Sequence, residues 1–132
     1  MLDLIIKNGK CYIDGQLKDV NISVKDGKIQ KIGQITEDAK DTIDATGLIV
    51  LPGCMDTQTH FREPGSTDTE DLHSGSRAAI VGGITSVFEM PNTNPPTSTK
   101  KEFQRKLDLA KNRMYCNYAF YFGATANNAD EL

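Results

Sequence analysis

The hydrophobic pattern of this chain changes at Pro52-Gly53, and this change limits its possible folds more than any other feature. Beyond that point, apolar segments alternate between strand-like and helix-like spacing. The pattern predicts strands over 54–59, 84–90 and 115–123 and helices over 70–81 and 99–113. Alternating strands and helices form parallel sheets. We therefore expect an α/β fold, with residues 51–132 forming about the first three βα units of a TIM-type (β/α) barrel.

The segment before this change, residues 1–50, has a different pattern. Its apolar residues alternate, as in Leu2, Leu4 and Ile6 and again in Val20, Ile22 and Val24. The breaks carry Asn8-Gly9, Asp14-Gly15 and Asp26-Gly27, dipeptides that tolerate the positive φ angles of hairpin turns. About 50 residues bury little apolar surface alone. We expect a small, incomplete β-sandwich module that takes further strands from elsewhere.

Capping signals mark the predicted helices. Thr67 with Glu70, and Thr99 with Glu102, have the spacing of capping boxes. The second helix presents one apolar face, made by Phe103, Leu107, Ala110 and Met114. A third helix starts over 127–131, where the sequence stops, so we expect a truncated barrel.

Composition excludes several classes of partner. The chain has 15 Lys+Arg against 18 Asp+Glu, a net charge of −3, and no basic run. It therefore lacks the charge pattern that binds nucleic acid or anionic membranes. No apolar run approaches the roughly 18 residues of a membrane span, and no signal peptide is evident. We expect a cytoplasmic protein whose three cysteines, Cys11, Cys54 and Cys116, are reduced.

Three residues with useful chemistry follow the first two predicted strands of the barrel. His60 and Arg62 follow the strand over 54–59, and Asn92 follows the strand over 84–90. The carboxyl ends of barrel strands build a shared active-site mouth. An imidazole can bind a metal there, while a guanidinium and a carboxamide can hold a substrate carboxylate.

Each of these residues also has a structural interpretation. His60 can bond only to backbone, Arg62 can pair with Glu63 or Asp56, and Asn92 is a natural turn residue beside Pro91. On the first helix, His73 is expected to be a solvated surface residue.

A set of motifs spread over 52–95 makes the pattern specific. It comprises Pro52-Gly53, Asp56, His60-Phe61-Arg62-Glu63-Pro64-Gly65, Ser74-Gly75-Ser76, Ala78-Ala79, Gly82-Gly83-Ile84-Thr85 and Met90-Pro91-Asn92-Thr93-Asn94-Pro95. Together they resemble the N-terminal third of a dihydroorotase, a cyclic amidohydrolase of the amidohydrolase superfamily. The resemblance implies a zinc-dependent, reversible hydrolysis of dihydroorotate to N-carbamoyl-aspartate in pyrimidine synthesis. It implies His60 as a metal ligand and Arg62 and Asn92 as residues that bind the substrate carboxylate.

One position departs from the motif of that family. Gln58 stands where the first histidine of a His-x-His metal pair is expected, and a neutral amide oxygen is a poorer zinc ligand than imidazole. The resemblance places the remaining ligands and the catalytic residue on later strands, so we expect no catalytic residue in this chain and no activity from it alone. Two alternatives stay open. One is a catalytically silent relative that assembles with aspartate transcarbamoylase, and the other is a related cyclic amidohydrolase such as allantoinase. Assembly into a homo-oligomer also stays open.

Overall fold

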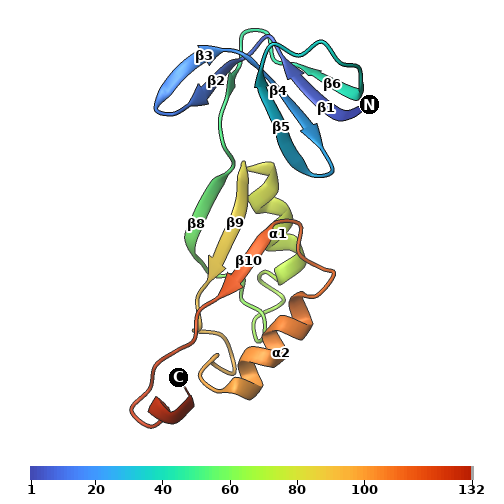
Figure 1. Cartoon of the computed structure of the whole chain (residues 1–132). Coiled ribbons are helices and arrows are strands. Elements are labelled where there is room, and N and C mark those ends of the chain that lie inside the picture. The colour runs from blue at the N-terminus through green and yellow to red at the C-terminus, as the bar shows by residue number, and fades with distance from the viewer. Residues whose placement is uncertain (132) are drawn as a thin grey trace. The chain divides into compact units, whose positions relative to one another are not determined.

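A computed structural model describes residues 1–131 of the chain (Figure 1). These residues form two compact units, Met1–Pro52 and the segment from Gly53 onward. The first unit contains only strands, and the second alternates strands with helices. Each unit is described by itself below.

The N-terminal unit contains two small sheets. The first has the strand order β5-β4-β1-β6 and the second the order β3-β2-β7. Their bounds are β1 Leu2–Lys7, β2 Lys10–Ile13, β3 Gln16–Asp19, β4 Asn21–Lys25, β5 Lys28–Gly33, β6 Ala39–Asp44 and β7 Ile49–Val50. The apolar residues buried in this unit are Leu2, Ile5, Cys11, Ile22 and Ala45. Its completion into a β-sandwich stays a prediction.

Two of the three predicted turns are hairpins. Asp14-Gly15 joins β2 to β3 and Asp26-Gly27 joins β4 to β5, and both residues of each pair have positive φ. This is the backbone of a type I′ turn, which matches the twist of the flanking strands. Asn8-Gly9 was expected to be a third hairpin, and that prediction is wrong. Only Asn8 has positive φ there, and the dipeptide connects β1 of one sheet to β2 of the other.

The second unit is a parallel three-stranded sheet with helices on one face (Figure 1). Its strands have the order β10-β9-β8, and β9 pairs in parallel with both neighbours. The elements are β8 Cys54–Thr59, α1 Leu72–Val81, β9 Ile84–Glu89, α2 Lys100–Ala110, β10 Asn117–Phe120 and the 3-10 turn Ala129–Glu131. Their core holds Phe61, Leu72, Val87, Ala110, Cys116 and Phe120. This α/β arrangement agrees with the expected βα pattern, while closure into a barrel stays a prediction.

Helix α1 begins two residues later than predicted, because a different pair of residues caps it. Asp71 accepts from the backbone N–H of Ser74 at 2.6 Å, and the Ser74 hydroxyl accepts from the Asp71 N–H at 3.1 Å. This is a complete capping box, so the Thr67–Glu70 box predicted from sequence is wrong. The hydrogen bonds that the N–H and the hydroxyl of Ser74 donate to the Asp71 carboxylate hold its pKa below the usual range, helped by the charge of Arg113.

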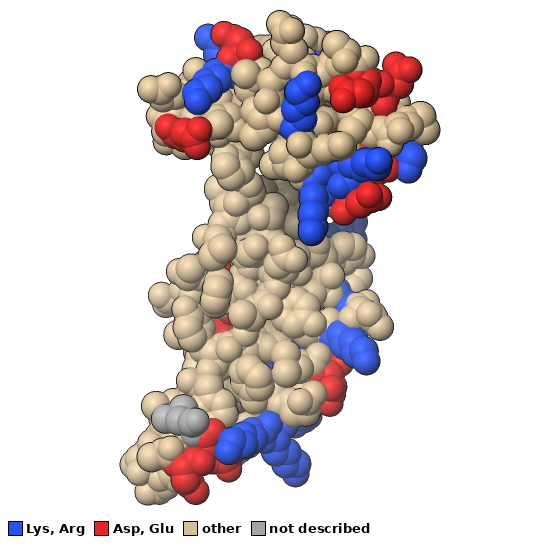
Figure 2. Space-filling model, viewed as in Figure 1, with Lys and Arg blue, Asp and Glu red and all other residues tan. Residues whose placement is uncertain are grey.

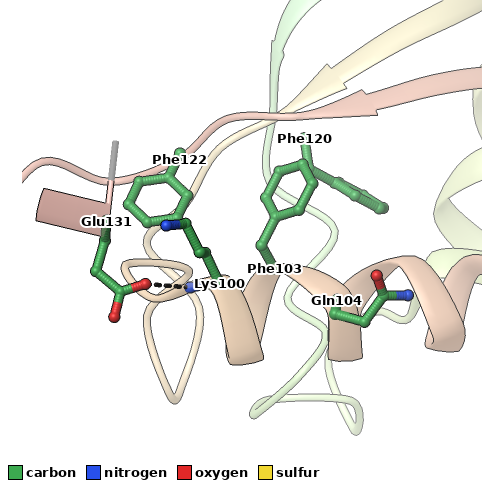
Figure 3. A pocket seen from close by; sticks show the side chains of 6 residues that line it. All are labelled: Lys100, Phe103, Gln104, Phe120, Phe122 and Glu131. Carbon is green, nitrogen blue, oxygen red and sulfur yellow. Dashed lines mark hydrogen bonds between the residues drawn. The ribbon is translucent and has the colours of Figure 1, made fainter.

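Helix α2 begins where predicted and ends earlier. Thr99 accepts from the Glu102 N–H at 3.2 Å, which confirms the N-cap. The side chain of Glu102 pairs with Arg105, and the carboxylate of Glu131 accepts from the Lys100 N–H at 2.9 Å (Figure 3). The helix ends at Ala110, three residues before the predicted end.

The predicted strand over 115–123 contains only β10, because residues on either side of it leave the sheet.

The face of the sheet opposite the helices is uncovered. Met55 pairs in register with Ser86, so both lie on one face together with Phe88, and Met55 is 60% exposed. Figure 2 shows that the surface over β8 and β9 carries very few charged side chains. No helix within residues 1–131 is long and apolar enough to cross a membrane.

Candidate functional site

Two loops at the carboxyl ends of β8 and β9 lie against each other and form the candidate site. Loop 60–66 follows β8 and loop 90–97 follows β9. The Met90 N–H donates to the Thr59 carbonyl at 2.9 Å, and the Asn94 N–H donates to the Pro64 carbonyl at 2.9 Å. A Cβ at Gly65 would lie 2.9 Å from the Cβ of Asn94. The loops therefore meet with no room for a side chain at this point.

The structure brings His60 and Asn92 into direct contact. Nδ1 of His60 lies 2.9 Å from Oδ1 of Asn92. A carboxamide oxygen only accepts, so Nδ1 is the donor, and Nε2 has no hydrogen-bond partner among the described residues. An imidazole that binds a metal through one nitrogen commonly donates a hydrogen bond through the other. The structural interpretation of His60 was a hydrogen bond to backbone alone, and the side chain instead contacts the side chain of Asn92.

Arg62 lies on the same loop with an exposed side chain. Its side chain makes no hydrogen bond or ion pair with any residue of the described chain, and its backbone is left-handed, with φ of 59°. The two carboxylates that the sequence offered as partners of Arg62, those of Glu63 and Asp56, bind other groups. Glu63 pairs with Arg113, and Oδ1 of Asp56 accepts from the Gln58 N–H at 2.9 Å. The guanidinium is thus available to a ligand.

The described residues fit a metal only in part. Nε2 of His60 suits zinc, whereas Gln58 offers a neutral amide from an irregular stretch of β8, where the register shifts between Asp56 and Thr59. No group of three or more His, Cys, Asp or Glu side chains within 1–131 is arranged to hold an ion. These residues therefore supply one imidazole and do not form a complete zinc site by themselves.

Sequence reasoning missed two ion pairs that anchor the site loops to α2 and the turn after it. Arg113 forms two bonds to Glu63 in loop 60–66, at 2.7 and 3.1 Å. Lys106 pairs with Glu89 at the end of β9 and donates to the Met90 carbonyl at 3.0 Å. A signal for Lys106 was present, because it lies three residues after Phe103 and four before Ala110, on the apolar face of the helix.

The Lys106–Glu89 pair is almost fully buried. The side chains are 0% and 1% exposed, and Oε2 of Glu89 faces Lys106 with no other polar partner among the residues described. Burial raises the pKa of Glu89 and lowers the pKa of Lys106, while their mutual attraction opposes both shifts. Lys106 also lies over the ring of Phe120, 5.2 Å from its centroid.

One cavity of this unit is lined by no residue of these two loops. It has a volume of about 580 Å³ and is lined by Lys100, Phe103, Gln104, Phe120, Phe122 and Glu131. In Figure 3 the rings of Phe103, Phe120 and Phe122 lie between α2 on one side and the end of β10 with the segment after it on the other. None of the site residues predicted from sequence lines it.

On the helix α1, exposed His73 contacts Tyr115, with Nε2 3.2 Å from the phenol oxygen.

Comparison with known proteins identifies a family and several relatives. Residues 49–131 match the model of the amidohydrolase family. Allantoinases of Escherichia coli O1:K1 and Salmonella choleraesuis are 45% and 44% identical over 131 residues. That alignment covers 98% of this chain and 29% of the length of each relative, so the chain spans less than a third of these proteins.

Solved structures agree. An L-hydantoinase (dihydropyrimidinase) from Arthrobacter aurescens superimposes with a TM-score of 0.90 at 36% identity, over 99% of this chain and 30% of that one. A D-hydantoinase from Thermus sp. gives 0.77 at 30% identity, over 92% of this chain and 27% of that one. These relatives are named for allantoin, hydantoin and dihydropyrimidine rings, and none of the four is named dihydroorotase. The expected amidohydrolase superfamily is therefore confirmed, whereas dihydroorotase in particular is not supported. From the match over 49–131, the chain belongs to the amidohydrolase family.

Proposed function

We propose that this chain forms the first part of the active site of a cyclic amidohydrolase. In this proposal β8, β9 and β10 are the first three strands of a (β/α) barrel, and the two loops at their carboxyl ends form one sector of its mouth. The parallel order of the strands, their helices on one face and the open apolar face on the other support it. The observation that carries the proposal is the His60–Asn92 contact, which leaves one imidazole nitrogen free.

The proposed reaction is attack of water on a ring amide carbonyl, with cleavage of the ring C–N bond to give a carboxylate and an open-chain amide nitrogen. A zinc ion at such a site lowers the pKa of water to about 7 and polarises the carbonyl. In this chain Asn92 holds the imidazole of His60 in one tautomer and orientation. Arg62 places a positive charge at the rim, where it attracts anionic groups of a substrate.

The favoured substrate class is a five-membered cyclic ureide, such as allantoin or a hydantoin. The names allantoinase and hydantoinase support this class, while the second name of the two hydantoinases, dihydropyrimidinase, points to a six-membered ring. Dihydroorotate is the second candidate, because the exposed guanidinium of Arg62 has no partner in the described chain and matches a carboxylate with two parallel hydrogen bonds.

A catalytically silent assembly partner, for aspartate transcarbamoylase or a second copy of the chain, is the alternative that Gln58 raises. The test for all three functions uses the complete protein that contains this chain. Zinc-supplemented protein is assayed with allantoin, 5-methylhydantoin and dihydroorotate, and kcat/KM is compared. Ring opening of any one of these substrates supports the proposal of a cyclic amidohydrolase. The substrate with the highest kcat/KM identifies the substrate class. No turnover of any ring, with zinc bound, overturns the enzymatic proposal and favours the silent partner.

A prediction for Arg62 separates the substrate classes. Arg62→Ala is expected to raise KM for dihydroorotate by about tenfold or more, the usual scale for a lost charge-assisted contact, with kcat little changed. KM for uncharged 5-methylhydantoin should change little. An unchanged KM for dihydroorotate would remove Arg62 from carboxylate binding.

A further inference from the structure

The backbone of Arg62 is held in a conformation that an arginine does not prefer. Its φ of 59° is left-handed, a conformation that is disfavoured for any residue with a Cβ. Such a conformation persists only where the surrounding structure fixes it. The hydrogen bond from the Ser66 N–H to the Arg62 carbonyl, at 3.0 Å, closes the turn but leaves the side chain of Arg62 exposed.

Both neighbours of Arg62 are buried and anchored. Phe61, 6% exposed, packs on α1, where a Cβ at Gly75 would lie 2.4 Å from its ring. Glu63, also 6% exposed, uses both carboxylate oxygens. Oε1 accepts from Arg113 at 2.7 Å, and Oε2 accepts from Arg113 at 3.1 Å and from the Leu72 N–H at 2.9 Å. The chain is therefore fixed on each side of Arg62.

Arg113 is itself fixed by further contacts. Its Nη1 donates to the Leu109 carbonyl at 3.1 Å, and its Nη2 lies 3.6 Å from Asp71, the N-cap of α1. Hydrogen bonds to Glu63 raise the pKa of Arg113. The guanidinium thus joins the turn after α2 and the start of α1 to the loop that carries Arg62.

We propose that Glu63 and Arg113 are a positioning pair, which holds loop 60–66 so that Arg62 presents its guanidinium to the substrate. The inference rests on the proposed role of Arg62 in binding an anionic group. Arg113 touches no substrate in this proposal. It acts through Glu63, 50 residues earlier in the chain.

The first test reads the loop directly and needs no turnover. Amide hydrogen exchange of Ser66 and Leu72 is measured in the 132-residue chain with Arg113→Met. We expect exchange of both amides to accelerate tenfold or more, while the Val87 amide in β9 stays unchanged. The control is Arg105→Met, which removes a partly exposed ion pair from the preceding helix α2. Arg113→Lys keeps the charge without the two-bond geometry and should give an intermediate rate. Unchanged exchange of Ser66 in Arg113→Met would overturn the proposal, and so would equal acceleration of Ser66 and Val87, because it would indicate general destabilisation.

The second test is kinetic and uses the complete protein. Arg113→Met should lower the ratio of kcat/KM for dihydroorotate over 5-methylhydantoin, in the same direction as Arg62→Ala, and the double variant should be no worse than Arg62→Ala. A loss shared equally by both substrates would indicate a merely structural role and overturn the positioning proposal. If Arg62→Ala leaves the ratio unchanged while Ser66 exchange accelerates, the substrate role of Arg62 fails and the anchoring of the loop stands.

Discussion

Replacing Lys106 with methionine is expected to destabilise the second unit strongly, because it leaves Glu89 buried without its cation. Removal of one partner from a buried ion pair typically costs about 3–5 kcal/mol. Both side chains here are at most 1% exposed, so little solvent is available to compensate. Lys106→Met and Glu89→Gln should each lower the free energy of unfolding by about this amount.

The double variant Lys106→Met/Glu89→Gln should be far less damaging than the sum of the two single variants. No buried charge remains in it, and the main loss is the pair of hydrogen bonds from Lys106 to the Met90 carbonyl and to the Thr97 hydroxyl. At a net value of about 1 kcal/mol each, the double variant should lose about 2 kcal/mol. The double-mutant cycle then gives a favourable coupling of several kcal/mol.

The stability of Lys106→Met should also depend on pH. Burial holds the pKa of Glu89 above its ordinary value of 4.5, and loss of the cation removes the interaction that opposes this shift. A carboxyl whose pKa is raised on folding takes up a proton when the protein folds. The deficit should therefore be smallest below pH 4.5 and should grow as the pH rises through the folded-state pKa.

The assay is urea unfolding at pH 4.5 and pH 8, with exchange of the Val87 amide as the probe for this unit. The matched control is Arg105→Met, which breaks the exposed pair with Glu102 on the same helix and should cost less than about 1 kcal/mol. Additive losses in the double variant, or a deficit independent of pH, would refute the reasoning.

Three further predictions concern packing, capping and metal binding. Gly75→Ala should lower stability by about 1–3 kcal/mol, seen as a lower Tm, because the new methyl group would collide with the ring of Phe61. Asp71→Ala should lower the free energy of unfolding by about 1 kcal/mol through loss of the N-cap. Because the pKa of Asp71 is lowered in the folded state, urea titrations should show this difference at pH 7, and it should vanish as the pH falls through that pKa. Gln58→His in the complete protein should raise bound zinc, measured by metal analysis, and no gain would mean that position 58 does not face the ion.

Local signals in the sequence predicted the elements whose ends are set locally. The bounds of β8 agree with the predicted strand over 54–59, and the hairpins at Asp14-Gly15 and Asp26-Gly27 follow from the backbone freedom of those residues. The start of α1 was not predicted, because Asp71 and Ser74 cap the helix in place of the expected Thr67–Glu70 pair. The carboxylate of Glu63, from a distant loop, also accepts from the Leu72 N–H at that point.

The candidate site was predictable where it depends on topology. Parallel strands bring their carboxyl ends to one edge, so His60 and Asn92 were expected to lie close together, and they are in contact. The anchors were not predictable in the same way. Glu63 and Arg113 lie 50 residues apart, and a charged residue in a polar loop ordinarily indicates solvent exposure. The contact between them becomes visible only in the folded structure.

The tight approach of Gly65 to Asn94 has a consequence for engineering this protein. With a Cβ-to-Cβ separation of only 2.9 Å available, any larger residue at position 65 forces the opposite loop to shift. We therefore expect that segments 60–66 and 90–97 must be exchanged together. Replacing only one of them with the segment of a relative that prefers another ring should fail, because the two loops would no longer fit against each other.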